Sequence, residues 1–458
     1  MSRLIPIAVL LLAPEASAQD ALVFVPEGDC TTRGGLRALD LLGDETLAEV
    51  VPGAGTVHAS KTMSLATLNA LLGDEDLDLD FFESPFDEID ALALPPQYVP
   101  TAWGSPSLLD YWWSGQHDFG EAFPAMVSDG SLWRLVKAPG AGGPVVEVTL
   151  DHALVQAGLG TTGPVDVDAA AFDGDGNLYL SFRDDELIQG DLVALGDGAI
   201  VAFAADDIAW NLDGTIADLG DDTAEIVLAE SDVDALVVAA ALLDELGAPV
   251  TKIGDLQALD VDPAGGTFLG ADGVTLWPNL LLAGSTQGPR VLTTANGGQL
   301  ATLNGVSLGD ASSPSGAALG LDGNGNDLAA LQVIPSRDLP LCLDLSGQGL
   351  TPQDLDDTLW IGNGASNATV WLLVALGPYS AGANFDATAL GDKFRYQSFH
   401  AWNYFLQLSL PLDAQGELQL DFSLDPADLP GDVNLVVQVA QILRPVEMSA
   451  PVVITWDQ

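Results

Sequence analysis

The sequence predicts an all-β protein in which a β-propeller-like repeat domain precedes a C-terminal β-sandwich. Three observations lead to this fold class. A short acidic phrase recurs along the first three quarters of the chain, the same order of turns and apolar strands comes after several of its copies, and long alternating runs begin near residue 341. Alternation of apolar and polar residues indicates strands with one buried face.

The first 18 residues have the form of a secretory signal peptide. The apolar run Leu4–Ala13 follows a basic residue and is too short to span a bilayer, which takes ~20 residues. Small residues at Ala16 and Ala18 suit cleavage before Gln19. The alternative is a buried N-terminal helix. We therefore expect a secreted protein that is extracellular, periplasmic or located at the cell surface.

The recurring phrase reads D-[IV]-D-A-L in its fullest form. Its copies begin at Glu88, Asp166, Asp232, Asp255 and Asp327, with a degenerate copy from Gly35. Most copies are spaced more widely than one propeller blade of ~40–50 residues. The copy at Asp232 is an exception, because it precedes the next by only 23 residues. One member of that pair is therefore not expected to begin a unit.

The segments that come after the phrase recur as well. The copy at Asp166 is succeeded by a Gly-rich turn, the strand-like segment Leu178–Phe182, and the Asp197-Gly198 turn before another apolar strand. Four short strands per unit, joined by Gly and Asp turns, favour a propeller, in which radial repetition buries faces that one unit cannot cover. We expect this domain to span residues 19–338. The alternatives are a β-solenoid and a stack of sandwich domains.

Helical signals are few. The segments Leu65–Gly73 and Asp234–Gly247 are the best candidates, since they carry apolar residues at helical spacing without a Pro. The second overlaps the copy of the phrase at Asp232, so only one of those two interpretations can hold there.

The C-terminal quarter, residues 341–458, predicts a β-sandwich. Its alternating runs are separated by turn residues and cover Thr369–Leu376, Tyr404–Leu412, Leu418–Leu424, Val433–Leu443 and Pro451–Trp456. The segment Pro335–Pro340 is the expected linker between the two domains.

Two stretches carry a resemblance to known proteins. The segment from Tyr404 (YFLQLSLPLDAQGELQLDF) and the run Gly431–Gln441 resemble the C-terminal sandwich module of large secreted proteins of environmental bacteria. The D-[IV]-D-A-L phrase with a subsequent strand such as Leu178–Phe182 likewise resembles repeat segments of uncharacterised exported proteins. The resemblance implies this architecture and carries over neither an activity nor any site residue.

Charge excludes some classes of partner. The chain has 458 residues, 66 of them acidic against 13 Lys and Arg, for a formal net charge of −53. Binding to nucleic acid through phosphate neutralisation needs clustered Lys and Arg, and an anionic membrane surface repels such a chain. A disordered acidic tail is excluded too, because 48% of the residues are hydrophobic. No membrane span is expected after the signal, and self-repulsion suggests saline or cation-rich surroundings.

Two Gly-rich loops are candidate calcium sites, and Ca²⁺ is the only cofactor that the sequence suggests. Their candidate ligands are Asp173, Asp175 and Asn177 in one loop and Asp322, Asn324 and Asn326 in the other. Oxygen side chains at alternate positions converge on one hard cation in calcium loops. Neither the distal Glu nor the framing helices of an EF-hand are present around the first loop. The alternative is a tight β-turn, which prefers the same residues.

An aromatic insertion after the copy at Glu88 is a candidate ligand site. Trp103, Trp112, Trp113 and His117 lie within it. Exposed aromatic faces stack on sugar rings, and polar neighbours bond hydroxyls, so carbohydrate or other cell-surface material is the expected ligand. The alternative is that these aromatics pack into the core.

The two cysteines, Cys30 and Cys342, meet an oxidising compartment in an exported protein, where they can form a disulfide. Such a bridge would tie the start of the repeat domain to the segment beyond its end. The alternative is two unrelated buried thiols.

The chain lacks H-E-x-x-H and the P-loop, and its single G-x-S-x-G match, Gly305–Gly309, is a short isolated pattern. We therefore expect an exported, acidic, non-enzymatic protein that acts in binding or cell-surface assembly. One alternative is a secreted hydrolase or lyase that uses Asp pairs at the propeller mouth, and another is a calcium-dependent adhesin. Convergence of Asp side chains in a funnel would favour the hydrolase, whereas a spread over the rim would favour the binding protein.

Overall fold

A computed structural model gives the fold of the chain. It describes residues 20–28, 30–33, 39–42, 47–52, 60–63, 89–96, 111–115, 127–137, 144–183, 186–188, 193–312, 316–322, 327–335, 342–345, 356–362, 367–376, 404–414, 418–423, 433–442, 446–448 and 452–456. The described part is all-β, as predicted: it consists of antiparallel sheets, and two α-helices accompany them.

Four sheets have four strands each. The first sheet contains β6 (Ile89–Ala93), β7 (Trp112–Gly115), β8 (Leu132–Lys137) and β9 (Pro144–Leu150). The second contains β10 (Val167–Phe172), β11 (Leu178–Phe182), β14 (Ile200–Phe203) and β17 (Glu225–Leu228). The third contains β18 (Ala258–Val261), β21 (Leu280–Ala283), β22 (Leu292–Thr293) and β23 (Gln299–Leu300). The fourth contains β27 (Leu328–Pro335), β1 (Asp20–Pro26), β4 (Leu47–Val50) and β5 (Ser60–Met63).

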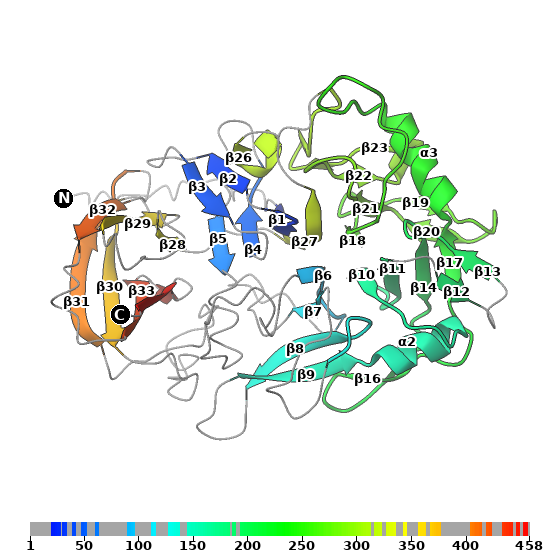
Figure 1. Ribbon diagram of the computed structural model, residues 1–458, viewed down its shortest axis with the longest axis horizontal. Coiled ribbons are helices and arrows are strands. Elements are labelled where there is room, and N and C mark those ends of the chain that lie inside the picture. The colour runs from blue at the N-terminus through cyan, green and yellow to red at the C-terminus, as the bar shows by residue number, and fades with distance from the viewer. Residues whose placement is uncertain are drawn as a thin grey trace, which may run out of the picture.

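The first-named strands of these sheets, β6, β10, β18 and β27, are here called the inner strands. Each contacts the inner strands of two neighbouring sheets, in the order β6, β10, β18, β27 and back to β6. Figure 1 shows them gathered at one centre, from which the four sheets extend outward. In the fourth sheet, β27 pairs with β1, so the first described strand lies beside the last described strand of this region.

The recurring phrase forms these inner strands. The copies at Glu88, Asp166, Asp255 and Asp327 run into β6, β10, β18 and β27, respectively. Their apolar side chains are buried because each inner strand has neighbours on both faces, which explains why small Ala residues recur there.

The copy at Asp232 is not a strand, which explains its short spacing. It lies in α3 (Glu230–Ala240), which begins before the predicted helix Asp234–Gly247 and ends well short of Gly247. An Asp232 carboxylate oxygen accepts a hydrogen bond from the Ala229 backbone N–H (3.2 Å), and Glu230 adds a second acid to the first turn, where negative charge stabilises a helix. The predicted helix Leu65–Gly73 and most of the degenerate phrase from Gly35 lie outside the described residues.

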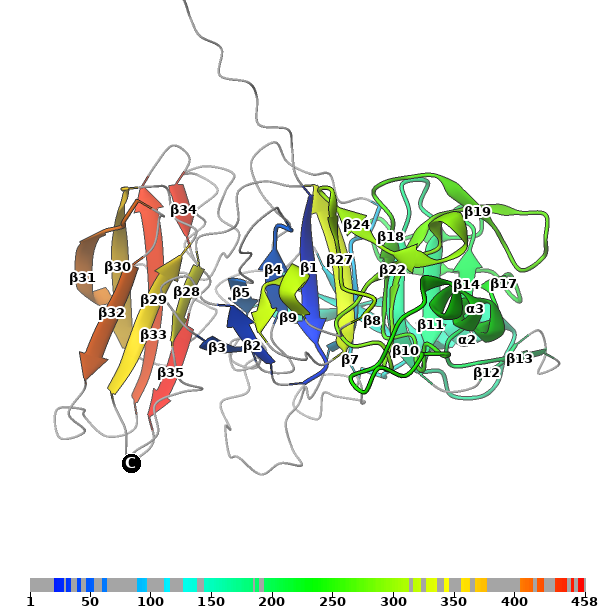
Figure 2. The same cartoon turned by 90° about the horizontal axis from the view of Figure 1, so that it is seen from above.

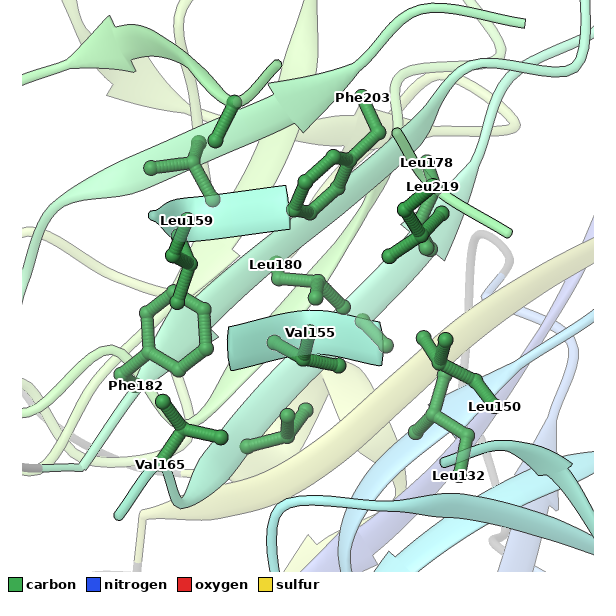
Figure 3. Close-up of a cluster of buried hydrophobic side chains, with 14 of the residues drawn as sticks. Leu132, Leu150, Val155, Leu159, Val165, Leu178, Leu180, Phe182, Phe203 and Leu219 are labelled. Carbon is green, nitrogen blue, oxygen red and sulfur yellow. The ribbon is translucent and has the colours of Figure 1, made fainter. Parts of the chain in front are cut away.

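The other helix, α2 (His152–Leu159), was not anticipated from the sequence. Asp151 caps it by accepting a hydrogen bond from the Ala153 N–H (2.9 Å), and Gly160 ends it in the left-handed conformation (φ 67°). Val155 and Leu159 are buried against the second sheet, within a cluster of apolar side chains (Figure 3). The helix therefore covers a face of that sheet.

The recurring Asp-Gly turns have a steric reason. A Cβ atom added to Gly130 would overlap the Val165 carbonyl oxygen, and one added to Gly198 would meet Ile253 Cγ2 at 2.9 Å. Val165 and Ile253 lie just before the inner strands of the next sheets. Glycine at these turns therefore permits neighbouring sheets to approach closely.

Shorter strands form additional small sheets. The two-stranded pairs are β12 (Glu186–Ile188) with β13 (Val193–Leu195), β15 (Ala209–Trp210) with β16 (Ile216–Asp218), β19 (Thr267–Leu269) with β20 (Leu276–Pro278), and β24 (Thr302–Leu303) with β25 (Val306–Ser307). A three-stranded sheet joins β26 (Leu321–Asp322), β2 (Cys30–Arg33) and β3 (Leu39–Leu42). Two 3₁₀ turns cover Ala295–Gly297 and Gly316–Leu319.

The C-terminal quarter forms two further sheets. One has β28 (Cys342–Leu345), β29 (Asp356–Gly362) and β32 (Leu418–Ser423), and the other has β31 (Tyr404–Pro411), β30 (Thr369–Leu376), β33 (Val433–Ile442), β34 (Val446–Met448) and β35 (Val452–Trp456). Figure 2 shows them next to one another at one end of the molecule, and β28 contacts β33 and β35 of the other sheet. The five predicted strands of this region are confirmed. The expected domain boundary falls between β27 and β28.

Candidate cation-binding site

The third position of the phrase lies at a β-bulge in the inner strands. In the first sheet, Ile89 pairs with Gly115 and Ala91 pairs with Ser114, so Asp90 is the extra residue. Register shifts at the same position leave Asp168 as the extra residue in the second sheet and Ala329 in the fourth. In the third sheet, the backbone of Gln257 donates to Ala283, which also pairs with Ala258. These four residues, Asp90, Asp168, Gln257 and Ala329, are called the bulge ring.

A β-bulge changes the direction of the side chain of its extra residue, and β-bulges are common next to functional sites. In this protein the bulges place hydrogen-bond acceptors between the inner strands, and not on a face of their own sheet. Asp168 is only 4% exposed, and the charges that act on it come from other sheets as well as its own: Asp90 from the first and Asp255 from the entry to the third. The bulge ring therefore brings carboxylates of separate sheets together.

Burial raises the pKa of Asp168 well above its ordinary value, and the negative charges of Asp90, Asp166 and Asp255 raise it further. Arg183 opposes the shift only in part. One oxygen of Asp168, Oδ2, accepts no hydrogen bond from any residue in the described part of the chain. The Oε1 atom of Gln257, its counterpart in the third sheet, is likewise buried without a donor among these residues.

The first acids of the phrase lie close to the bulge ring, since Asp166 and Asp255 both act on Asp168. We call Asp166, Asp255 and Asp327, together with Glu27 and Asp197, the acidic mouth. Asp197 lies in the turn before β14 of the second sheet, and its carboxyl group is hydrogen-bonded to that of Asp255. Burial, followed by this contact with Asp197, raises the pKa of Asp255. The negative charge of Asp197 opposes ionisation of Asp255, which therefore keeps its proton more readily than an ordinary Asp.

Asp327 completes the mouth at the fourth sheet. Its Oδ1 atom accepts a hydrogen bond from the Gly288 N–H (2.6 Å), and burial and the charge of Glu27 raise its pKa to about 6. A cation, Arg183, lies beside the bulge ring, with its Nη1 atom 3.9 Å from Oδ2 of Asp90. Among the described residues, acids outnumber the basic groups at this end of the inner strands.

The other end of the inner strands has a different character, because its polar groups are satisfied. Asp260 accepts hydrogen bonds from the backbone N–H groups of Val261 (2.7 Å) and Val333 (2.5 Å) and from Nε2 of Gln332 (3.0 Å). Burial still raises the pKa of Asp260 to about 7. This end is therefore a closed structural network, whereas the acceptors that lack a described donor lie in the bulge ring.

The calcium candidate at Asp173 is a tight turn in the structure. Its Oδ1 atom accepts hydrogen bonds from the N–H groups of Asp175 and Asn177, and its Oδ2 atom accepts from Asn177 Nδ2 and the Tyr179 hydroxyl, all within 2.9 Å. A calcium ion would have to displace these donors, so the loop as folded does not fit the ion. Of the second candidate, Asp322 ends β26, whereas Asn324 and Asn326 lie outside the described residues. Within the described part, no group of three or more His, Cys, Asp or Glu is arranged to hold a metal.

The expected aromatic ligand site is corrected in part. Trp112 and Trp113 are completely buried in β7, where Trp112 packs edge-on against Phe172 and Trp113 stacks on Trp133. They form core, as the alternative interpretation held, and present no face to a sugar. Trp103 and His117 lie outside the described residues.

The expected disulfide has no support. Cys30 is buried in β2, Cys342 begins β28 in a different sheet, and no disulfide is found where side chains are described. The side chain of Cys342 lies outside the described set. The expected signal peptide, residues 1–18, also lies outside it.

Sequence reasoning missed the bulge ring, although its signal was present. The phrase contains two acids, and the second stands between apolar residues of a buried strand, where an unpaired acid is rare. The Asp197–Asp255 contact had no local signal, because the two residues belong to different sheets.

Comparisons with known proteins add little to this geometry. No protein-family model matches the chain, and no curated protein matches it. The solved structure of PorZ, an essential bacterial surface component of the type-IX secretion system of Porphyromonas gingivalis, is similar at 10% sequence identity and a TM-score of 0.22. That match covers 90% of this chain, which spans little more than half (56%) of the PorZ chain. Within the described residues, no helix is both long and apolar enough to cross a membrane.

Proposed function

We propose that this protein is an exported binding protein whose acidic mouth accepts a cationic group of its partner. The observation that carries the proposal is the convergence of acids from separate sheets on Asp168, a buried carboxyl group with an oxygen that no described donor satisfies. Buried acids repel one another and lose hydration, and a bound cation offsets both costs. The secretory signal expected at residues 1–18 supports export to a cell surface or beyond.

The proposal includes a fold for the repeat region: a four-bladed β-propeller followed by a β-sandwich. The cyclic contacts of the inner strands and the pairing of β27 with β1 support closure, because a propeller closes when the two ends of the chain share a blade. Facing C-terminal sheets support the sandwich. In a propeller the bulge ring and the acidic mouth lie on the central axis, where ligands have access from one end.

Calorimetric titration with short peptides tests the proposal. An acetylated and amidated peptide with basic residues should bind, and a matched peptide with neutral polar residues should not. Asp166→Asn combined with Asp327→Asn should weaken binding by about 10-fold or more, since each neutralised acid weakens a charge-assisted contact. Asp206→Asn is the matched control, because Asp206 is exposed beyond the far end of β14. Equal affinity in all these variants would defeat the proposal.

One observation favours a second function, a hydrolase that acts through the hydrogen-bonded carboxyl pair of Asp197 and Asp255. A pair that shares one proton can activate water as a base on one side and donate a proton on the other. The convergence of Asp side chains is the arrangement that this alternative requires, so it supports the hydrolase as well as the binding protein. The buried oxygen of Asp168 that no described donor satisfies is what favours binding, because a bound cation would satisfy it. Hydrolysis of a peptide or glycoside library by the purified protein, lost in Asp255→Asn and kept in Asp206→Asn, would support it; no turnover at acid or neutral pH would exclude it.

A further inference from the structure

The bulge ring presents two acceptors that lack donors. Oδ2 of Asp168 and Oε1 of Gln257 are both buried, and neither accepts a hydrogen bond from a described residue. They occupy the same position of the phrase in β10 and at the start of β18, two inner strands in contact with each other. In the fourth sheet the corresponding residue is Ala329, whose methyl group is far smaller than either acceptor side chain.

We infer that the bulge ring binds a primary ammonium group, the end of a lysine side chain or of a small alkylamine. This inference rests on the proposed function and names its ligand. An ammonium carries three N–H donors and one positive charge on a compact head. It can therefore satisfy a carboxylate oxygen and an amide oxygen at once, and its charge offsets the acids around Asp168.

Other cations fit these residues less well. Calcium takes six to eight oxygen ligands in proteins, and the described carboxylates supply no group of three arranged for a metal. A guanidinium is planar and wide, and the ring already faces one, the side chain of Arg183 beside Asp90. A compact ammonium has the positive charge and the N–H donors that these two acceptors lack.

The charge state of Asp168 supports the same ligand. Its raised pKa means that it holds a proton more readily than an ordinary carboxyl group in the free protein. The groups that face it are Asp90, Asp166 and Asp255, which raise the pKa, and Arg183, which lowers it. A bound ammonium would lower it, so binding should release a proton and should weaken as the pH falls.

Isothermal titration calorimetry with four probes tests the inference. The probes are n-butylammonium chloride, acetyl-Gly-Lys-Gly-amide, acetyl-Gly-Arg-Gly-amide and calcium chloride. We expect the first two to bind and the last two to bind at least about 10-fold more weakly. Asp168→Asn should reduce butylammonium affinity by about 10- to 100-fold, and Gln257→Leu should reduce it several-fold, because the first removes a charge-assisted hydrogen bond and the second a neutral one. Asp206→Asn should have no effect.

The outcomes separate this inference from the proposed function. Binding of the arginine peptide or calcium in preference to the amines, at a site sensitive to Asp168→Asn, overturns the inference and keeps the function. Failure of every cation to bind overturns both. If butylammonium binds and the lysine peptide does not, the result supports an ammonium site in the bulge ring and shows that its ligand is a small alkylamine. Urea unfolding of each variant separates lost binding from lost folding, and unchanged affinity in a folded Asp168→Asn protein contradicts the inference.

Discussion

Gln332 and Asp260 form a hydrogen bond across two sheets. Nε2 of Gln332, on β27, donates to Oδ2 of Asp260, on β18, at 3.0 Å. Oε1 of the same Gln332 accepts from the backbone N–H of Leu94, one residue beyond β6, at 3.0 Å. A single amide side chain thus connects the third, fourth and first sheets, and its position at the closed end of the inner strands contrasts with the open acceptors of the bulge ring.

Replacement of Gln332 should destabilise the fold strongly. Gln332→Leu would leave a carboxylate oxygen of Asp260 with one donor fewer and the Leu94 N–H with none, at a cost of roughly 2–4 kcal/mol in the free energy of unfolding. Gln332→Glu would place a second carboxyl group against Asp260, so its loss should be smaller at acid pH, where the pair can share a proton. Urea unfolding at two pH values measures both. A Gln332→Leu protein as stable as the wild type would show that this link does not hold the sheets together.

Substitution of Gly by Ala should destabilise the protein to different extents at different turns. Gly130→Ala would press a Cβ atom into the Val165 carbonyl, and Gly198→Ala would crowd Ile253, so both should lower the free energy of unfolding by about 1–3 kcal/mol, with Gly130→Ala the worse. Gly174 is the matched control, since a Cβ atom there meets nothing within 4 Å. Gly174→Ala should be neutral or slightly stabilising. Similar losses at all three positions would refute close approach of the sheets as the cause.

Stability should fall as the pH rises from about 4 to about 7. The pKa values of Asp168 and Asp255 are raised in the folded state, that of Asp327 is raised to about 6 and that of Asp260 to about 7, whereas an unfolded Asp titrates near 3.9. The folded protein therefore binds more protons across this window, and deprotonation favours the unfolded state. The lowered pKa values of the exposed Asp213, Asp272 and Asp310 act in the opposite sense, but only below about pH 4.

Urea unfolding at constant ionic strength measures this pH dependence. We expect a higher midpoint at about pH 5 than at about pH 8, and a flatter profile near pH 6 in Asp327→Asn than in the Asp206→Asn control. A midpoint that rises with pH through this range would show that these carboxyl groups are ionised more easily in the folded protein than in the unfolded chain.

Salt should stabilise the protein. A net charge of −53 on 458 residues produces mutual repulsion that is screened as the ionic strength increases. The melting temperature should therefore be higher in ~1 M than in ~0.05 M sodium chloride, where the Debye length is several times longer. Equal melting temperatures would mean that the acids are spaced too widely, or neutralised too well, to repel one another.

Much of the strand pattern could be predicted from the sequence, because alternation and turn residues are local signals. The runs Thr369–Leu376 and Val433–Leu443 match β30 and β33 to within a residue. The phrase at Asp232 was ambiguous because the same residues are compatible with a strand and with the acidic first turn of a helix. In the structure they form a helix. α2 was not predicted because it has only eight residues. A cap at Asp151 and a few buried positions make too short a pattern to recognise in the sequence.

The candidate site was less predictable, for a physical reason. The direction of Asp168 depends on a one-residue bulge, and a bulge is set by pairing with a partner strand that the local sequence does not reveal. The burial of Trp112 and Trp113 likewise depends on Phe172 and Trp133 in other strands. Composition showed that acids are abundant; only the pairing of strands shows which of them meet.

Proton release on amine binding tests the central claim, that the buried carboxyl group of Asp168 in the bulge ring receives a cation. Calorimetry of n-butylammonium binding at about pH 7, repeated in buffers of different ionisation enthalpy, measures the number of protons released. The account predicts a clear release from the wild-type protein and a smaller one from Asp168→Asn. Binding without proton release, or the same release from both proteins, would contradict it.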